Sequence, residues 1–473
     1  MRIGVGVIAA VLLTLVGRTS AQAQEGRGEA EDRFFRQQRM VDEQAQQERR
    51  QTAPVQSLLD FQWGGWIDYY VYHFDDGQQR SRFGQRPGLA LWTRATIDQG
   101  AHEVFARMRL RYTWFRDGDE IDRQEDWFGP DFEQVWYQID VGRAFRLNRP
   151  SDPLQLRARI GRQNVVFGTG YALDLPMQAV LLDARLYDFR VHGLFGKSIL
   201  NYPNPIDRSE PVDSHSDRLF YGVQVSYEGF RRHVPFVYAL WNNDRTDERP
   251  KDAFQNYSYD SFYLGAGARG ELAHNLTYWI EGVLESGHSY GDGQFLRRDY
   301  IAAYGWDIGI EKRFDVLTHP RVVGEYMFAS GDGDRLWSPT NADGGNRGGR
   351  RDTSFAAFGF RDTGISLAPT MSNLHVWRVG ASFTPLERYE LLRQLELGTN
   401  WFLYAKHRTH GAISDPLADN FSGYVGWEMD YFINWRLSSD LSWTLRWGTF
   451  CPGSAYQDQH TRHFLLTGVT WSF

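Results

Sequence analysis

Three arginines stand at every second position of one segment, Arg107, Arg109 and Arg111, within the sequence EVFARMRLRYTWF at residues 103–115. Successive side chains of a β-strand point to opposite faces of the sheet, so a strand here places all three guanidinium groups on one face. Guanidinium groups bind carboxylates through paired hydrogen bonds. The spacing therefore predicts an anion-binding surface.

The opposite face of this segment is apolar and aromatic, with Met108, Leu110, Tyr112 and Trp114. An arginine that faces lipid near the bilayer midplane costs about 2 to 4 kcal/mol. The arginine row covers only about 13 Å at ~3.3 Å per residue, so its three members cannot all reach the membrane interfaces. We therefore expect the apolar face to meet lipid and the arginine face to line the inside of a membrane β-barrel.

Alternating segments of this kind recur from Asp60 to Phe473. They predict an all-β fold, a transmembrane antiparallel β-barrel of about eighteen strands with short periplasmic turns and long extracellular loops. Barrels of this size leave an aqueous lumen. The predicted strands lie near residues 61–74, 89–98, 104–115, 132–145, 154–163, 180–187, 190–199, 219–228, 234–242, 262–271, 276–285, 300–312, 321–330, 374–383, 395–407, 424–437, 441–450 and 463–473.

Composition supports this class and excludes others. Beyond the extreme N-terminus, no run approaches the roughly 18 to 20 apolar residues that a transmembrane helix needs. The 17 Trp and 24 Tyr suit aromatic girdles at the two membrane interfaces. The single cysteine, Cys451, excludes a disulfide framework. A formal net charge of −7 argues against nucleic acid as a partner.

The first 23 residues are typical of an export signal, which predicts delivery to the outer membrane of a Gram-negative bacterium. Arg2 supplies a positive start, residues 3–16 are apolar, and Ala21 and Ala23 stand at positions −3 and −1 of a cleavage site. The alternative is a short membrane anchor. Residues 24–59 are charged and rich in Gln, so we expect a polar periplasmic arm. This arm is either solvated, or docks to a periplasmic export protein or into the barrel mouth.

The breaks between predicted strands alternate in length, as barrel topology requires. Residues 99–101, 271–275 and 438–440 would be periplasmic turns, whereas 331–370 and 410–421 would be extracellular loops. The longest loop either folds partly into the pore mouth or stays mobile outside it. Its Asp332 and Asp334 form either a Gly/Asp turn or a Ca²⁺ site.

Because odd and even positions of a strand point to opposite faces, and one of these faces is apolar on each predicted strand, the polar side chains of the other face are assigned to the lumen. Either the inward arginines pair with inward carboxylates as wall braces, or they form an anion path. On the segment of Arg107 the only acid is Glu103, which favours an anion path there. Inward aromatics, Phe105, Trp136 and Phe450, would stack on sugar rings or pack loops. The inward arginines are Arg107, Arg109, Arg111, Arg157, Arg159, Arg185, Arg269, Arg378 and Arg446; the inward acids are Asp68, Asp140, Asp183, Glu281, Glu285, Asp307, Glu311, Glu428 and Asp430.

Several segments resemble the alginate export family of outer-membrane porins. They are RIGRQNVVFGTG at 159–170, EYMFASGDGD at 325–334, GFRDTGI at 359–365 and the closing strands from SGYVGWEMDYFINWRL. The terminal Phe473 on a last alternating strand is also similar to the assembly signal of outer-membrane barrels. The resemblance runs from about residue 60 to 473. It implies a monomeric barrel that lets an anionic exopolysaccharide diffuse outward through an arginine-lined constriction, with Arg162 and Arg361 as constriction residues by motif.

We therefore predict a porin that is not an enzyme and that needs no cofactor or metal. The nucleotide-like pattern GxGxxG at 265–270 lies inside a predicted strand and opens no helix. The alternative function is a diffusion porin for small anionic solutes. A barrel-embedded hydrolase is a further rival, but it requires a Ser/His/Asp cluster at the membrane rim, and the sequence indicates none.

Overall fold

The computed structural model describes residues 59–75, 81–117, 126–145, 154–199, 217–245, 259–289, 298–335 and 351–473. The predicted export signal and nearly all of the predicted polar arm lie outside these residues. Among the residues described, no helix has the length and apolarity to cross a membrane.

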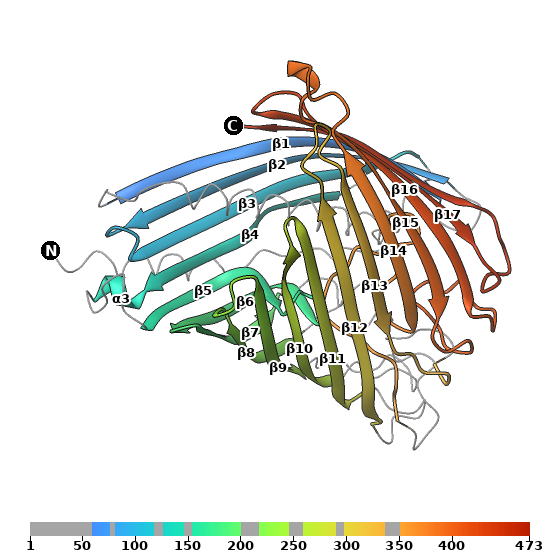
Figure 1. The fold of residues 1–473 in the computed structure, drawn as a ribbon, viewed down its shortest axis with the longest axis horizontal. Helices are drawn as coiled ribbons and strands as arrows, with labels where there is room; N and C mark the ends of the chain where they lie inside the picture. The colour runs from blue at the N-terminus through green and yellow to red at the C-terminus, as the bar shows by residue number, and fades with distance from the viewer. Residues whose placement is uncertain are drawn as a thin grey trace.

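The chain forms a closed, antiparallel β-barrel of eighteen strands, arranged around the barrel in sequence order. Figure 1 shows this order as a colour run from blue to red. Each predicted strand corresponds to an observed one. The strands are β1 Leu59–Asp75, β2 Ser81–Ile97, β3 His102–Phe115, β4 Asp126–Asp140, β5 Leu154–Phe167, β6 Leu173–Leu186, β7 Phe189–Ser198, β8 Arg218–Tyr227, β9 His233–Asp244, β10 Asp260–Ala273, β11 Leu276–His288, β12 Tyr300–Arg313, β13 Arg321–Ala329, β14 Leu374–Phe383, β15 Leu395–Lys406, β16 Tyr424–Arg436, β17 Leu441–Pro452 and β18 Arg462–Ser472; the short helices are α3 Val141–Ala144 and η1 Glu390–Leu392.

The first and last strands close the barrel. β1 pairs with β18 from Trp66 opposite Ser472 to Phe74 opposite Phe464. Beyond that ladder, Phe473 and Gly65 exchange two backbone hydrogen bonds, of 2.9 and 3.0 Å. The C-terminal aromatic residue is therefore part of the seam, and no strand edge is left open there.

Two strands differ from their predicted bounds for local reasons. β2 begins at Ser81, before its predicted start at residue 89, and it includes Pro87, which has no backbone N–H to donate to the sheet. The ladder to β3 is indeed interrupted at this proline. β4 ends at Asp140, where its side chain accepts a hydrogen bond from the backbone of Arg143 and caps the helical turn α3. Residues 141–144, expected in the strand, are helical for that reason.

The shortest connections lie at one end of the barrel and the longest at the other. We call the first the turn end; it includes 98–101, 187–188, 274–275 and 437–440, and β1 begins and β18 ends there. The other, the loop end, includes 330–373 and 407–423. The short and long breaks alternate along the sequence as predicted.

Side chains alternate between a buried lumen face and an outer face that meets lipid. On β5, Gln163, Val165 and Phe167 are buried, whereas Ile160 and Val166 are about half exposed. Large aromatic residues cover the outer face near its ends, with Trp63, Trp127 and Trp471 prominent among the exposed side chains.

The hydrophobic core lies inside the barrel. Two loop-end segments, 168–172 and 351–373, fold inward and pack their aromatic side chains against inward residues of the wall. Phe355 and Phe358 are almost completely buried beside Phe220 and Tyr263. The long loop therefore folds into the pore mouth, one of the two outcomes considered for it; its central part, 336–350, lies outside the described residues.

Candidate functional site

The arginine row of β3 faces the lumen, and its first two members bracket one carboxylate. Arg107 and Arg109 are only 1% and 5% exposed. Glu133 of β4 lies 3.0 Å from the Nε of Arg107 and 3.2 Å from the Nη1 of Arg109. The ring of Trp66 covers both guanidinium groups from β1. These two arginines act as a braced pair in the wall.

A β-bulge brings Glu133 into this position. Arg107 pairs with Gln134 and Met108 pairs with Phe132, so Glu133 is an extra residue between these two pairs. We did not predict Glu133 as a partner, because an unbroken strand would turn it outward. A signal was present in the sequence: the outward apolar residues change parity between Phe132 and Val135.

Other inward arginines of this wall are less enclosed. Arg111 is partly exposed and stacks on Phe128, with 4.4 Å from guanidinium carbon to ring centroid. Arg159 of β5 stacks on Trp136 at 4.2 Å and donates to Gln138 at 2.6 and 3.0 Å. Both guanidinium groups are thus stacked on aromatic rings and partly exposed.

Arg162 does not share the face of Arg159. Its parity on β5 is that of the exposed residues Ile160 and Val166, and its cross-strand partner Gln178 is also exposed. Its guanidinium group forms a bidentate pair with Asp131, at 2.8 and 3.0 Å. This pair joins β4 and β5, and the constriction role that the motif implies for Arg162 stays a prediction.

Arg361 lies on the inserted loop and connects three parts of the barrel interior. Its Nε donates to Asp307 of β12 at 2.7 Å, and its other nitrogens reach Thr169. Burial alone would lower the pKa of this guanidinium group, but Asp307 and Glu281 raise it above its usual value, so the group stays charged. Arg361 is therefore a loop anchor inside the lumen.

The two segments that carry the most characteristic family motifs, 159–170 and 359–365, lie against each other beside Arg361. Phe358 and Phe360 of the long loop donate backbone hydrogen bonds to Ala172 and Gly170 of the short loop, at 3.0 and 3.1 Å. A Cβ on Gly359 would collide with the carbonyl oxygens of Gly170 and Tyr171. Only glycine permits so close an approach of the two backbones.

Inward acids hold these loops in place. Glu428 of β16 accepts hydrogen bonds from the backbone of Ile365, Ser366 and Leu367, at 2.6 to 2.8 Å. Glu285 accepts from the backbone of Ala356 at 2.9 Å, and Glu281 from the backbone of Thr169. Glu281, Glu285 and Glu428 therefore hold the inserted loops against the barrel wall by accepting backbone hydrogen bonds. Strand parity predicted that these acids face the lumen, but it could not predict that they bind loops.

The remaining predicted arginines occupy separate places. Arg446 of β17 stacks on Phe432 and donates to Asn434 at 2.8 Å. Arg378 bridges Glu325 and the loop residue Asp362, at 3.1 and 3.0 Å. Arg157 and Arg185 lie near the turn end, with Arg157 paired to Asp140 and Arg185 to Glu228.

The inward aromatics considered for sugar stacking are covered by protein. Phe105 and Trp136 stack on each other at 5.4 Å, and both are less than 5% exposed. Phe450 is fully buried against Tyr404 and Tyr456. In the structure these three side chains therefore pack against other protein side chains, rather than standing open to a sugar ring.

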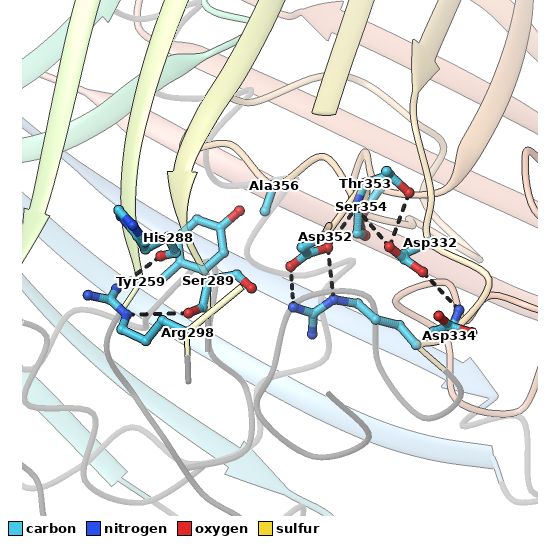
Figure 2. A network of polar contacts seen from close by, with 12 residues as sticks. Tyr259, His288, Ser289, Arg298, Asp332, Asp334, Asp352, Thr353, Ser354 and Ala356 are labelled. Atoms are coloured by element: carbon cyan, nitrogen blue, oxygen red, sulfur yellow. Dashed lines mark hydrogen bonds and ion pairs between the residues drawn. The ribbon is translucent and has the colours of Figure 1, made fainter. Parts of the chain in front are cut away.

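Asp332 and Asp334 form a turn at the neck of the long loop. Asp332 accepts from the backbone of Asp334 and of Thr353, each at 2.8 Å, while Asp352 pairs with Arg335. Figure 2 shows Asp332 and Asp352 directed toward Thr353 and Ser354. The carboxylate of Asp332 is thus engaged by protein donors, and the described residues contain no group of acids, histidines or cysteines arranged for a metal ion.

The fold is that of outer-membrane porins. The structure is similar to those of Pseudomonas aeruginosa OccK8 (OprE), with TM-score 0.54, 11% identity, and coverage of 88% of this chain and 98% of that one. It is similar to OccK11 (OpdR) of the same species, with TM-score 0.53, 11% identity and coverage of 88% and 96%. OpdQ, also from that species, gives TM-score 0.52, 12% identity and coverage of 88% and 99%.

The chain belongs to the alginate export family, whose sequence model matches residues 89–465. This family and this fold are those of transport proteins, and they support an outer-membrane porin. No curated protein sequence matches the chain.

Proposed function

We propose that the protein passively exports an anionic exopolysaccharide of the alginate type through an arginine-lined lumen, with the driving force supplied elsewhere. The supporting observation is an excess of positive charge on one wall. The inward residues of β3 to β5 include Arg107, Arg109, Arg111, Arg157 and Arg159 against the acids Glu103, Asp131, Glu133 and Asp140. We call this surface the arginine wall.

The arginine wall combines attraction with release. Carboxylates of a polymer are drawn to its positive field, which the low dielectric of the barrel wall strengthens. Arg111 and Arg159 are partly exposed, so a polymer carboxylate can approach them, whereas Arg107 and Arg109 are almost completely buried beside Glu133. Conduction requires sites that an ion can leave as well as occupy, and a row of weak sites meets this requirement.

The inserted loops narrow the passage opposite the arginine wall. They are pinned at Glu281, Glu285 and Glu428, so a polymer would pass as a single extended chain. In this proposal Arg361, Arg446 and Arg378 contribute to the electrostatic field of the constriction. The protein acts as a monomer in the lipid of the outer membrane, and the N-terminal arm, outside the described residues, contacts periplasmic export proteins.

The pinned loops also favour a second candidate function, a diffusion porin for small anionic solutes. A narrowed lumen passes small anions whether or not a polymer can thread it. The two functions differ in the size of the anion that crosses.

Efflux from proteoliposomes tests the proposal. Vesicles that contain the purified protein are loaded with a fluorescent decamer of galacturonic acid, or with neutral dextran of the same length as the control. We expect rapid efflux of the decamer and retention of the dextran. Retention of the decamer together with chloride efflux would establish the small-anion porin instead.

A further inference from the structure

The turn end of the barrel carries a second group of arginines, apart from the inserted loops. Arg143, Arg157, Arg185 and Arg190 lie along the rim formed by α3 and the strands β5 to β7. We call them the arginine arc. These strands are neighbours in the barrel (Figure 1). Arg157 belongs to both groups, because β5 runs from the arginine wall down to this rim.

Strand register makes the arc continuous. One cross-strand row runs from Asp140 through Arg157 and Asp183 to His192. In the adjacent row Arg185 stands directly opposite Arg190. The residues that flank Arg185 and Arg190 outward, Leu186 and Phe189, are about half exposed, so the arginines of these rows face the lumen mouth.

Two arginines directly opposite each other on neighbouring strands repel, and such a pair destabilises a sheet unless an anion lies between them. Here Glu228, from the β8–β9 turn, lies 3.4 Å from Arg185 and 3.8 Å from Arg190, and Asp183 also pairs with Arg190, at 2.7 Å. The protein itself thus shows a carboxylate bound between two guanidinium groups.

Exposure separates the arc from the braced pair higher in the lumen. The side chains of Arg157, Arg185 and Arg190 are 47%, 47% and 44% exposed, whereas those of Arg107 and Arg109 are 2% and 6% exposed. Exposed ion pairs contribute only about 0 to 1 kcal/mol, because water and salt screen them. The acids of these pairs are 13 to 26% exposed. Glu228, at 3.4 and 3.8 Å from its two arginines, is held less closely than Asp140 or Asp183, so a carboxylate that arrives from outside can replace Glu228 most readily.

We propose that the arginine arc is a capture site for the carboxylates of an acidic polysaccharide, which it loads into the barrel from the turn end. Incoming uronate groups displace Glu228 from Arg185 and Arg190 and pass step by step toward Arg159. The inference rests on the proposed export function, and it adds where the chain first binds and in which direction it is loaded.

Single-channel recording tests capture from each side separately. A decamer of galacturonic acid is added to one side of a planar bilayer that holds a single oriented channel, and the rate of blockades is measured. For the parent protein we expect faster capture from the turn end than from the loop end. The triple variant Arg157→Gln, Arg185→Gln, Arg190→Gln should slow turn-end capture roughly tenfold or more, in line with electrostatic steering, and leave loop-end capture unchanged.

Two further variants make the outcome specific. Glu228→Gln removes the resident carboxylate and should raise the turn-end capture rate. Arg436→Gln is the matched control, because Arg436 is an exposed turn-end arginine on β16 that donates to the backbone of Ser439, away from the arc. It should leave capture unchanged. Equal slowing by Arg436→Gln and by the triple variant would overturn the arc as a distinct site.

Failures of the two proposals are distinguishable. Unchanged turn-end capture in the triple variant, in a channel that still prefers anions and passes the decamer, overturns the arc alone. The absence of any blockade of the parent overturns both proposals. If the triple variant does not fold, the parent is measured at 0.1 and 1 M KCl. Turn-end capture must then fall more steeply with salt than loop-end capture, and equal slopes overturn the arc.

Discussion

Arg361 and Asp307 join the inserted loop to the barrel wall through a 2.7 Å contact between Nε and Oδ2. Asp307 is completely buried on β12, and the same guanidinium group reaches Thr169 on the other inserted loop. One side chain therefore fixes both loops against one strand. The position of both inserted loops depends on this pair.

Breaking the pair on one side should destabilise the protein. Arg361→Gln leaves a buried carboxylate without its charged partner, and we expect the free energy of unfolding to fall by about 3 to 5 kcal/mol. Urea unfolding in detergent measures the effect. The double variant Arg361→Gln, Asp307→Asn should recover much of the loss, because neither charge is left alone. Strict additivity of the two single variants would contradict direct pairing.

A single methyl group should displace the inserted loop. Gly359→Ala places a Cβ against the backbone of Tyr171, so the two loops must separate, and we expect larger and noisier single-channel conductance. Gly333→Ala is the matched control on the same loop, because a Cβ at Gly333 meets no atom within 4 Å. An effect of equal size in the control, or none at Gly359, would contradict the contact.

Within the arginine wall, we expect some residues to contribute mainly to stability and others mainly to anion selectivity. Glu133→Gln leaves Arg107 and Arg109 beside each other without the carboxylate between them, so we expect a loss of stability of about 3 to 5 kcal/mol and a stronger preference for anions. Arg159→Gln removes a partly exposed charge, so we expect a weaker preference for anions and a smaller loss of stability. Unfolding curves and ion selectivity of both variants check this. If stability and ion selectivity changed in the same way in both variants, the result would contradict the idea that Arg107 and Arg109 stabilise the wall while Arg159 attracts anions.

Strand number, order and facing were predictable because period-two alternation records lipid on one side and water on the other. The arginine face of β3 follows from the cost of a charge in lipid, and the structure buries Arg107 and Arg109 on the lumen side. This reasoning fails where local backbone geometry interrupts the alternation of residues along a strand. The bulge at Glu133 adds one residue, and the cap at Asp140 ends a strand.

Partners across the barrel could not be predicted. Asp307 and Arg361 are 54 residues apart in sequence and meet only because a loop folds inward. Glu428 was recognised as an inward acid, but its three backbone donors at 365–367 belong to that same loop. The motif around Gly359 marked the loop as special, and its physical reason, a close backbone approach, is visible only in three dimensions.

The reversal potential of a single channel under a tenfold KCl gradient tests the central claim most directly, because its sign reports which ion crosses. Because of the arginine wall, we expect a reversal potential whose sign shows that chloride is more permeant than potassium. The Arg159→Gln variant should move it toward zero, and Arg111→Gln should shift it in the same direction. A parent channel that prefers potassium would contradict an arginine-lined path for anions.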